Sequence, residues 1–271
     1  MKVFKNTKAF IKRQPLSMVF RPKRQFVAFC IGTAKSGTSS IAAMFSRFRS
    51  FLEPNSGELI REIIRSENNS RTRDSRLMAA FSRCDREHLP EMNSSQINGF
   101  YLKEIETLHP AAKYILTIRP CLNWLESFAN HHYETRTVKV AKLYWHEYRK
   151  FRFGRYGYSF ESDETAVEEA GLFPIEAYVH FWADYNNDML ARAPIDRTLI
   201  VKTCDLGHSC SKIERFLGLR DGSLDPGSSH KNIRTQKTFS VRQTVAAEYL
   251  EAVVARHCIG PLAKYAVSTD S

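Results

Sequence analysis

Short apolar runs alternate with amphipathic segments along this chain. Three runs have the length and β-branched content of buried strands, and each is followed by a turn or helix signal: residues 26–31, 114–118 and 198–201. Segments with helical periodicity lie between and after them: residues 57–65, 121–132, 174–191, 210–217 and 241–258. The alternation predicts a three-layer α/β fold, with helices flanking a central parallel β-sheet and ligands bound at the carboxyl ends of its strands.

Two stretches, residues 66–98 and 136–173, lack a clear period. We expect both to be insertion-like loops that recognise a substrate, because loops carried by a rigid sheet often hold specificity. Residues 136–155 contain seven Lys or Arg against one acid, Glu147, with aromatic side chains interleaved. This segment either stacks on sugars or bases and neutralises acidic groups, or is amphipathic with a solvated basic face.

Composition suits one domain. The 271 residues are 43% hydrophobic and 25% charged, and no repeat or Pro/Ser-rich linker divides them. We therefore predict a single domain over residues 1–271, in which residues 1–24 are a basic N-terminal extension with eight Lys or Arg and no acid. Neither an apolar signal-peptide core nor a membrane-spanning run occurs, which favours a soluble, cytoplasmic protein.

The net charge of +11 and the sequence pI near 9.4 indicate an anionic partner. Charge alone leaves nucleic acid, an acidic membrane surface, an acidic glycan and a highly charged cofactor open. The six cysteines include no Cys-x-x-Cys pair and no histidine spacing suited to zinc. We expect reduced, mostly packing cysteines, with Cys30 and Cys121 the most deeply buried, and no metal.

Residues 26–41 read as a buried strand, a glycine-bracketed turn and a helix, which is how a chain builds a phosphate cradle. Gly32 and Gly37 let the backbone curl, so the amides from Lys35 to Ser39 point inward at the positive end of the helix dipole. The lysine precedes the second glycine, whereas the loop for ATP or GTP ends in Gly-Lys-Ser/Thr. This P-loop-like turn is therefore predicted to cradle a different phosphate group.

A second motif follows at residues 114–127, where a strand ends at Arg119 and Ser127 stands eight positions later. Together the two motifs resemble the sulfotransferases that use 3′-phosphoadenosine 5′-phosphosulfate (PAPS), in their glycan and tyrosylprotein branch. Pro120 directly after the arginine departs from the pattern of many members. The resemblance covers residues 26–53 and 100–128 well and residues 198–235 loosely, and a bacterial setting fits it better than a Golgi one.

The resemblance implies how the donor is held. Lys35 contacts the bridging or 5′-phosphate oxygen, and the neighbouring amides and hydroxyls hold the 5′-phosphate: Ser36, Gly37, Thr38, Ser39 and Ser40. Arg119 and Ser127 bind the 3′-phosphate, and Lys231, with Arg234 as a further candidate, lies near the phosphates in a downstream loop. PAPS is thus the expected donor, and the family needs no metal.

The resemblance also implies a base. Glu53, just after the helix that follows the phosphate loop, matches the catalytic glutamate of this branch. His88 and His109 are the alternatives in the style of the histidine-based members, although neither lies in a Lys-x-His context. Lys103 resembles a lysine upstream of the 3′-phosphate motif that polarises the sulfuryl group.

The sequence therefore predicts sulfuryl transfer from PAPS to a hydroxyl, or an amine, of a carbohydrate or glycoconjugate, by in-line displacement with a glutamate base. We expect no specific nucleic-acid partner, and peripheral contact with an anionic membrane surface is compatible with the charge. Two alternatives stay open. One is a P-loop kinase-like phosphotransferase, which would need a Mg²⁺-binding aspartate at a strand end, and the other is a non-enzymatic polyanion-binding protein that uses residues 136–155.

Overall fold

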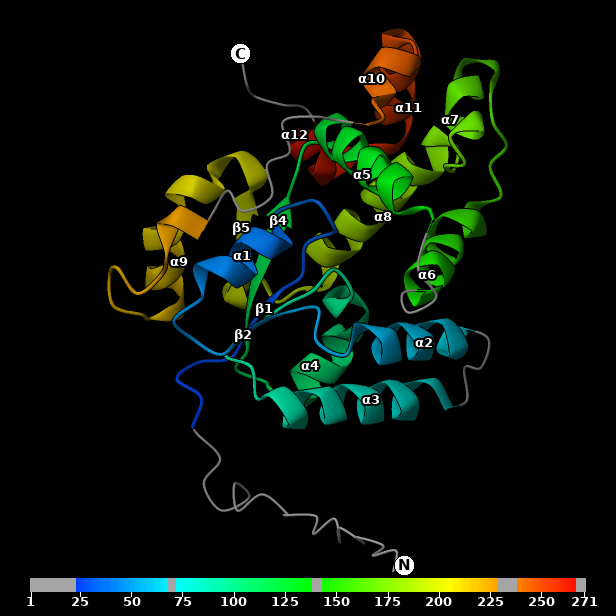
Figure 1. Cartoon of the computed structure of the whole chain (residues 1–271). Helices are drawn as coiled ribbons and strands as arrows, with labels where there is room; N and C mark the ends of the chain where they lie inside the picture. Colours follow the sequence, from blue (N-terminus) through cyan, green and yellow to red (C-terminus); the bar gives the residue numbers. More distant parts are fainter. Residues whose placement is uncertain (1–22, 68–71, 138–142, 229–237, 267–271) are drawn as a thin grey trace, which may run out of the picture.

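A central five-stranded parallel sheet organises the protein (Figure 1). The computed structural model describes residues 23–67, 72–137, 143–228 and 238–266. The strands are β1 (Ala28–Cys30), β2 (Ser50–Leu52), β3 (Met92–Ser94), β4 (Lys113–Ile118) and β5 (Thr198–Lys202). They lie in the order β2-β3-β1-β4-β5, and every neighbouring pair is parallel. The predicted three-layer α/β fold with a central parallel sheet is confirmed.

The two faces of the sheet are covered unequally. Ala28 and Cys30 of β1 belong to a small apolar cluster with helices α1 (Thr38–Met44) and α9 (Cys210–Leu217). Phe29, between them in sequence, belongs to a larger cluster on the other face. Because successive side chains of a strand point to opposite faces, this alternation separates the two outer layers.

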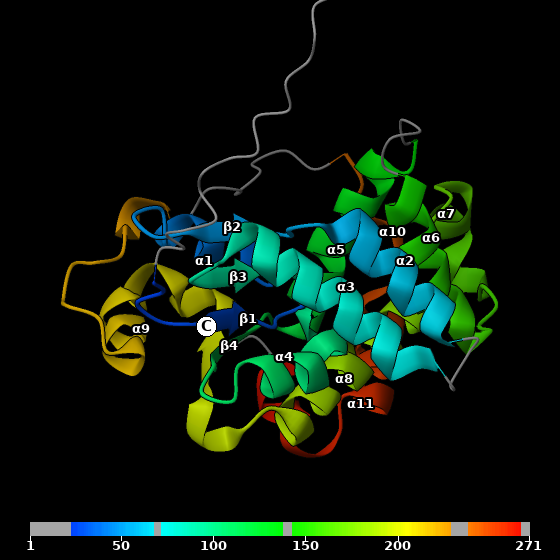
Figure 2. The ribbon, with the colours of Figure 1, turned by 90° about the horizontal axis from the view of Figure 1, so that it is seen from below.

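The larger layer holds most of the helices, and in Figure 2 α2 and α3 run side by side, on the opposite side of the strands from α9. Its core contains the fully buried Trp124, Tyr178 and Trp182. Its α-helices are α2 (Ser56–Glu67), α3 (Arg73–His88), α4 (Leu102–Leu108), α5 (Cys121–Thr135), α6 (Leu143–Phe153), α7 (Thr165–Glu169), α8 (Ile175–Arg192), α10 (Val241–Thr244), α11 (Ala247–His257) and α12 (Ala263–Ala266). Short 3₁₀ turns connect them, among them η3 (Asn98–Tyr101), η5 (Gly154–Tyr156), η7 (Ile195–Arg197) and η8 (Thr203–His208).

The prediction that residues 66–98 and 136–173 are loops was wrong. The first stretch contains α3 and β3, and the second contains α6 and α7. Helix α3 buries only a narrow stripe, namely Leu77, Ala80, Phe81 and Cys84, and presents a charged surface elsewhere. The many charges obscured that stripe. The predicted helix over residues 241–258 is also divided, because α10 ends at Thr244 and α11 begins at Ala247.

The six cysteines form no disulfide, and Cys30 and Cys121 are buried as predicted, together with Cys84 and Cys258. Within the described residues, no helix combines the length and the apolar character that crossing a bilayer requires. In the same part of the chain no three His, Cys, Asp or Glu side chains gather as a metal-binding group would.

Candidate active site

The loop after β1 lies at the centre of the carboxyl edge of the sheet. β1 has β3 on one side and β4 on the other, and the chain leaves it toward β2 and returns later to build β4. Such a reversal of strand order opens a crevice where α/β proteins bind ligands. Lys35 and Gly37 both have positive φ angles, 64° and 110°, so the backbone coils back before α1 begins at Thr38.

Close packing against β4 holds this loop in place. A Cβ atom on Gly32 would stand 2.0 Å from Thr117 Oγ1 and 2.7 Å from the Thr117 carbonyl oxygen, so only glycine fits. The buried Ser36 hydroxyl lies 2.6 Å from the Thr33 carbonyl oxygen, to which it donates, and 2.8 Å from Thr117 Oγ1. The Ser36 amide also bonds to Thr33. The structure thus commits both Ser36 donors to the loop itself.

The start of α1 supplies the open donors of this loop. The first N–H groups of a helix have no acceptor within the helix, and here no side chain caps them. They belong to Thr38, Ser39 and Ser40, and Ser39 is half-buried rather than enclosed. Amides with no partner in the helix, at the positive end of its dipole, attract an anion.

The structure brings the second predicted motif to this loop. Arg119 follows β4, and its Nη1 donates to the Lys35 carbonyl oxygen at 3.3 Å. Trp124 Nε1 of α5 donates to the Ala34 carbonyl oxygen at 2.7 Å. Trp182 Nε1 of α8 in turn bonds to the Arg119 carbonyl oxygen at 3.2 Å. Residues 84 and 90 positions apart in sequence therefore form one surface.

Arg119 carries a positive charge that no carboxylate of the described residues neutralises. The residue is half-buried, and no described carboxylate forms an ion pair with it. Burial and the nearby Arg242 charge both lower the pKa of the Arg119 guanidinium, although it stays protonated at neutral pH. Arg242 Nη2 is held at 2.6 Å from Asn123 Oδ1 on α5. Two neighbouring cations favour the binding of an external anion close to both.

Ser127 lies on the same helix as Asn123 and four residues further on, so the two share a face. The Ser127 side chain is half-buried and makes no hydrogen bond to any side chain or carbonyl group of the described residues. Arg242 is thus a neighbour of the predicted 3′-phosphate pair that the sequence did not reveal. Its basic charge alone could not single it out among 40 Lys and Arg.

Glu53 stands two strands further along the same edge, after β2, with β3 lying between β2 and β1. Its backbone N–H donates to the Ser94 carbonyl oxygen at 2.9 Å, and Gln96 Nε2 donates to its Oε1 at 2.9 Å. Burial raises the pKa of Glu53 to about 7, against the opposing effect of the Gln96 hydrogen bonds. Ser94 Oγ also donates to the Thr38 carbonyl oxygen at 2.7 Å. One β3 residue thus ties the carboxylate to the phosphate loop.

The two histidines considered as bases have other partners. His109 Nε2 lies 3.2 Å from Asp85 Oδ1, in a cluster that also includes Arg24. His88 Nε2 lies 2.9 Å from Asn55 Oδ1. His109 precedes β4 and so lies toward the amino ends of the strands, away from the loop after β1. Of the three candidates, only Glu53 is bonded to the strand end that holds this loop.

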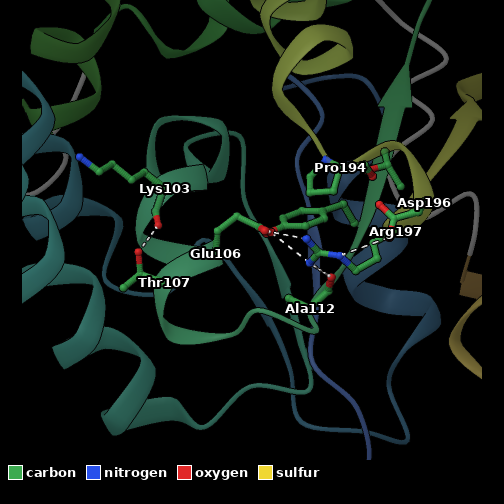
Figure 3. Close-up of polar contacts among 9 residues, drawn as sticks. Lys103, Glu106, Thr107, Ala112, Pro194, Asp196 and Arg197 are labelled. Atoms are coloured by element: carbon green, nitrogen blue, oxygen red, sulfur yellow. Dashed lines mark hydrogen bonds and ion pairs between the residues drawn. The ribbon is translucent and has the colours of Figure 1, made fainter.

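Lys103 is separate from this site. Its ammonium pairs with Asp74 of α3, and both side chains are 66% exposed. Figure 3 shows the Lys103 side chain extending away from the ion pair that Glu106 makes with Arg197 (2.6 Å), a pair that joins α4 to the turn before β5. Lys231 lies outside the described residues.

The structure places part of the basic segment at 136–155 in the interior. Most of its described part forms α6, and Arg149 and Arg152 on this helix are 7% and 6% exposed. Arg149 Nη2 donates to Thr135 Oγ1 at 2.6 Å. Two of its cations are therefore part of the interior rather than a solvated face.

Residues that the sequence analysis missed complete the loop. Thr203 Oγ1, just after β5, lies 2.6 Å from the Ser36 carbonyl oxygen and 3.2 Å from the Ile118 carbonyl oxygen. The Leu206 side chain leaves no room for a Cβ atom on Gly37, which would stand 2.3 Å from Leu206 Cδ1. Both residues follow the predicted strand at 198–201, and this position after a strand was the signal in the sequence that could have indicated them.

Comparison with known proteins gives structural similarities only. No protein-family model matches the chain, and no curated protein matches it. A sulfotransferase from Alicyclobacillus acidocaldarius is 16% identical, with 86% of this chain and 93% of that chain covered and a TM-score of 0.48. The sulfotransferase domain of the curacin biosynthetic pathway is 11% identical, with 85% and 96% covered and a TM-score of 0.42. The sulfotransferase domain of the Synechococcus PCC 7002 olefin synthase is 14% identical, with 89% and 90% covered and a TM-score of 0.42. Similarities of this size assign no role to a residue.

Proposed function

We propose that this protein is a sulfotransferase that uses PAPS as the donor and sulfates a hydroxyl group of a carbohydrate or glycoconjugate. One observation carries the proposal: the Arg119 guanidinium lies against the loop at Lys35 without a carboxylate partner among the described residues. A donor with a phosphate at each end of its nucleoside needs two neighbouring cationic pockets. The amides after Lys35 and the Arg119 side chain offer such a pair.

The two pockets divide the donor between them. The loop amides, with Lys35 and the hydroxyls of Thr38, Ser39 and Ser40, hold the 5′-phosphate. Arg119, Ser127 and Arg242 hold the 3′-phosphate, because an arginine fork binds such a group in a bidentate manner. When bound, PAPS supplies an activated sulfuryl group whose leaving phosphate must be stabilised. Lys35, at the turn of the loop, does so by its positive charge.

Glu53 acts as the general base. A base is most effective when its pKa lies near the working pH, and the pKa of Glu53 is raised to about 7. Burial supplies that shift, while Gln96 orients the carboxylate through its hydrogen bond to Oε1. The free carboxylate oxygen takes the proton from the attacking hydroxyl. Lys103 has no place in this scheme, since it is paired on the surface.

Aromatic rings beside Glu53 support a sugar acceptor. Tyr144 of α6 lies within 3.5 Å of the Ser56 hydroxyl, three residues after Glu53. Tyr148 of the same helix is buried, and burial raises its pKa to about 12, with the Arg152 charge opposing this shift and the Glu53 charge adding to it. Aromatic faces beside polar groups suit the apolar faces and hydroxyls of a sugar.

Nucleotide binding tests the proposal most directly. We expect 3′-phosphoadenosine 5′-phosphate (PAP) to raise the melting temperature of the protein. At a PAP concentration a hundredfold above Kd, the free energy of unfolding should rise by about 2.7 kcal/mol. Arg119→Ala should abolish most of this gain but preserve the weaker effect of 5′-AMP, which lacks the 3′-phosphate. The exposed Arg65→Ala variant is a matched control that should behave as wild type.

Two results would contradict the proposal. One is a wild-type protein that melts at the same temperature with and without PAP. The other is an Arg119→Ala variant that loses PAP and 5′-AMP binding equally, because Arg119 would then only support the loop. Stabilisation by Mg²⁺-ATP but not by PAP would favour a phosphotransferase instead. With PAP binding established, labelled PAPS and a panel of glycans would identify the acceptor.

A further inference from the structure

A cavity lies in the larger helical layer, and no residue of the phosphate loop lines it. Its volume is ≈ 390 Å³, and helices α2, α3, α6 and α8 surround it with η3 and η5. Tyr185 lines this cavity. Its hydroxyl donates to the carbonyl oxygens of Ile31 (3.0 Å) and Gln96 (3.2 Å), which lie next to the phosphate loop and to the partner of Glu53, so Tyr185 stands between the cavity and the candidate active site. A cavity of this size accommodates a small organic molecule.

Arg152 is the unusual residue of this cavity. Its side chain is 6% exposed, and its guanidinium carbon lies 4.3 Å from the ring centre of Phe100 and 4.4 Å from that of Phe181. The Nε atom is enclosed and has no hydrogen-bond partner among the described residues. No ion pair joins Arg152 to a carboxylate in that same part of the chain.

The carboxylates that line the cavity are committed to other groups. Asp188 pairs with Arg192 at 2.7 Å, and Glu67 lies 3.8 Å from Arg155. Asp184 accepts a hydrogen bond from Tyr156 at 3.0 Å and lies 3.4 Å from His180. The lining holds four arginines against three carboxylates, the fourth cation being Arg73 of α3. Among the described residues, neither the buried Arg152 nor the exposed Arg73 has an ion-pair partner, so these two carry the excess positive charge.

An unpaired buried charge is unfavourable by several kcal/mol unless a partner neutralises it. Two aromatic faces recover part of this through cation–π contact. Burial still lowers the pKa of the Arg152 guanidinium. A protein gains little from such a residue in the apo state. An arginine in contact with two rings, whose Nε donor has no partner among the described residues, is instead preorganised to receive a planar or tetrahedral anion.

We propose that this cavity is a second ligand site, in which Arg152 binds the carboxylate, sulfate or phosphate group of a small molecule. Phe100 and Tyr156 enclose the apolar part of that ligand, and Arg73 at the exposed rim attracts it. The site is independent of the nucleotide site, since none of its lining residues belongs to the phosphate loop or to the Arg119 cluster. The anion is either free in solution or attached to a sugar.

Sulfate binding tests the site. We would titrate the full-length protein with sodium sulfate at constant ionic strength, with chloride as the compensating ion, and follow thermal unfolding. The measurement is made in the Arg119→Ala background, in which the nucleotide site is weakened. We expect saturable stabilisation that Arg152→Met weakens at least tenfold in apparent affinity.

Arg149→Met is the matched control. Arg149 lies one turn earlier on α6 and is equally buried, but it is hydrogen-bonded to Thr135 and does not line the cavity. This variant should keep the sulfate response. Arg152→Met should also be as stable as the parent without sulfate, because a buried unpaired charge has been removed. Should either buried variant fail to fold, Arg73→Ala at the exposed rim still tests the cavity, with an expected severalfold loss of affinity.

Different results decide whether the site exists, whether its anion is free or attached to a sugar, and whether the proposed function holds. Equal sulfate affinity in the parent, Arg152→Met and Arg73→Ala proteins overturns the site, as does the absence of saturable stabilisation. Glucose 6-sulfate that binds at least tenfold more tightly than sulfate, with glucose inactive, identifies a sugar-borne anion; equal binding identifies a free anion. Failure of PAP to bind the wild-type protein refutes the proposed sulfotransferase and leaves these results unaffected.

Discussion

Replacing Glu53 with glutamine should make the protein more stable, by an amount that depends on pH. The pKa of Glu53 is about 7 in the folded protein and 4.5 in an unperturbed chain. Each pKa unit corresponds to about 1.36 kcal/mol, so the ionised carboxylate destabilises the fold by up to about 3 kcal/mol. Because Glu53 is only partly enclosed, water screens the charge and this figure is an upper bound.

The sign follows from proton binding. Below about pH 4.5 both states hold the proton, and Glu53 contributes nothing to the pH dependence. Between pH 4.5 and about 7 the unfolded chain releases the proton while the folded protein keeps it, so stability falls as pH rises. Above that window the whole penalty is present. Glu53→Gln removes it and keeps an oxygen that can accept from Gln96.

Urea unfolding at pH 5 and pH 8 measures the effect. We expect Glu53→Gln to gain up to about 3 kcal/mol over wild type at pH 8 and only a small fraction of this at pH 5. Glu58→Gln, which removes a partly exposed carboxylate paired with Arg83, should change stability by about 1 kcal/mol or less at both values. A Glu53→Gln gain that is equal at both pH values, or absent at pH 8, refutes the reasoning. In the enzyme assay, wild-type activity should rise with pH through about 7, and the variant should lose it.

Three further substitutions test the loop and its surroundings. Gly32→Ala places a Cβ 2.0 Å from Thr117 Oγ1, so we expect a loss of about 3 kcal/mol or more in urea unfolding together with lost PAP binding; normal PAP affinity would contradict the packing argument. Trp124→Phe leaves the Ala34 carbonyl without its donor, and should weaken PAP binding while lowering stability by about 1–3 kcal/mol, as calorimetry can show. Lys103→Ala should leave PAP affinity and turnover unchanged, and a large fall in turnover would restore Lys103 to the active site.

Apolar periodicity was enough to predict the core of the fold. The predicted strand at 114–118 and β4 differ by one residue, because a run such as Tyr-Ile-Leu-Thr-Ile has few alternatives to a buried strand. β3 is Met-Asn-Ser, and nothing in three such residues marks a strand. It exists because β1 and β2 pair with it on both sides, at Phe29 and Phe51. That stabilisation is tertiary and leaves no local pattern.

The predicted site residues divide in the same way. Lys35 and Arg119 lie in short motifs, and the structure brings them into contact. Ser36 has the right motif position, but its donors turn inward to Thr33 and the sheet, which depends on how closely β4 packs. Arg152 lay within a basic run for which a solvated face was one of two interpretations, and neither predicted a buried arginine. Its burial depends on Phe100, 52 positions away, and such contacts cannot be read from one segment.

The position of Glu53 relative to the loop depends on the register of the sheet rather than on the loops themselves. Ser94 bonds to Glu53 through its carbonyl oxygen and to Thr38 through its hydroxyl, and the β2–β3 register pairs Leu52 with Ser94. A slip of one residue would move Glu53 by about 3.3 Å and turn its side chain to the opposite face. A base that must lie within hydrogen-bond reach of a reacting hydroxyl tolerates no such change. In the proposed mechanism, the short strand β2, half-exposed at the edge of the sheet, is therefore the element that positions the base, although it adds little to the core.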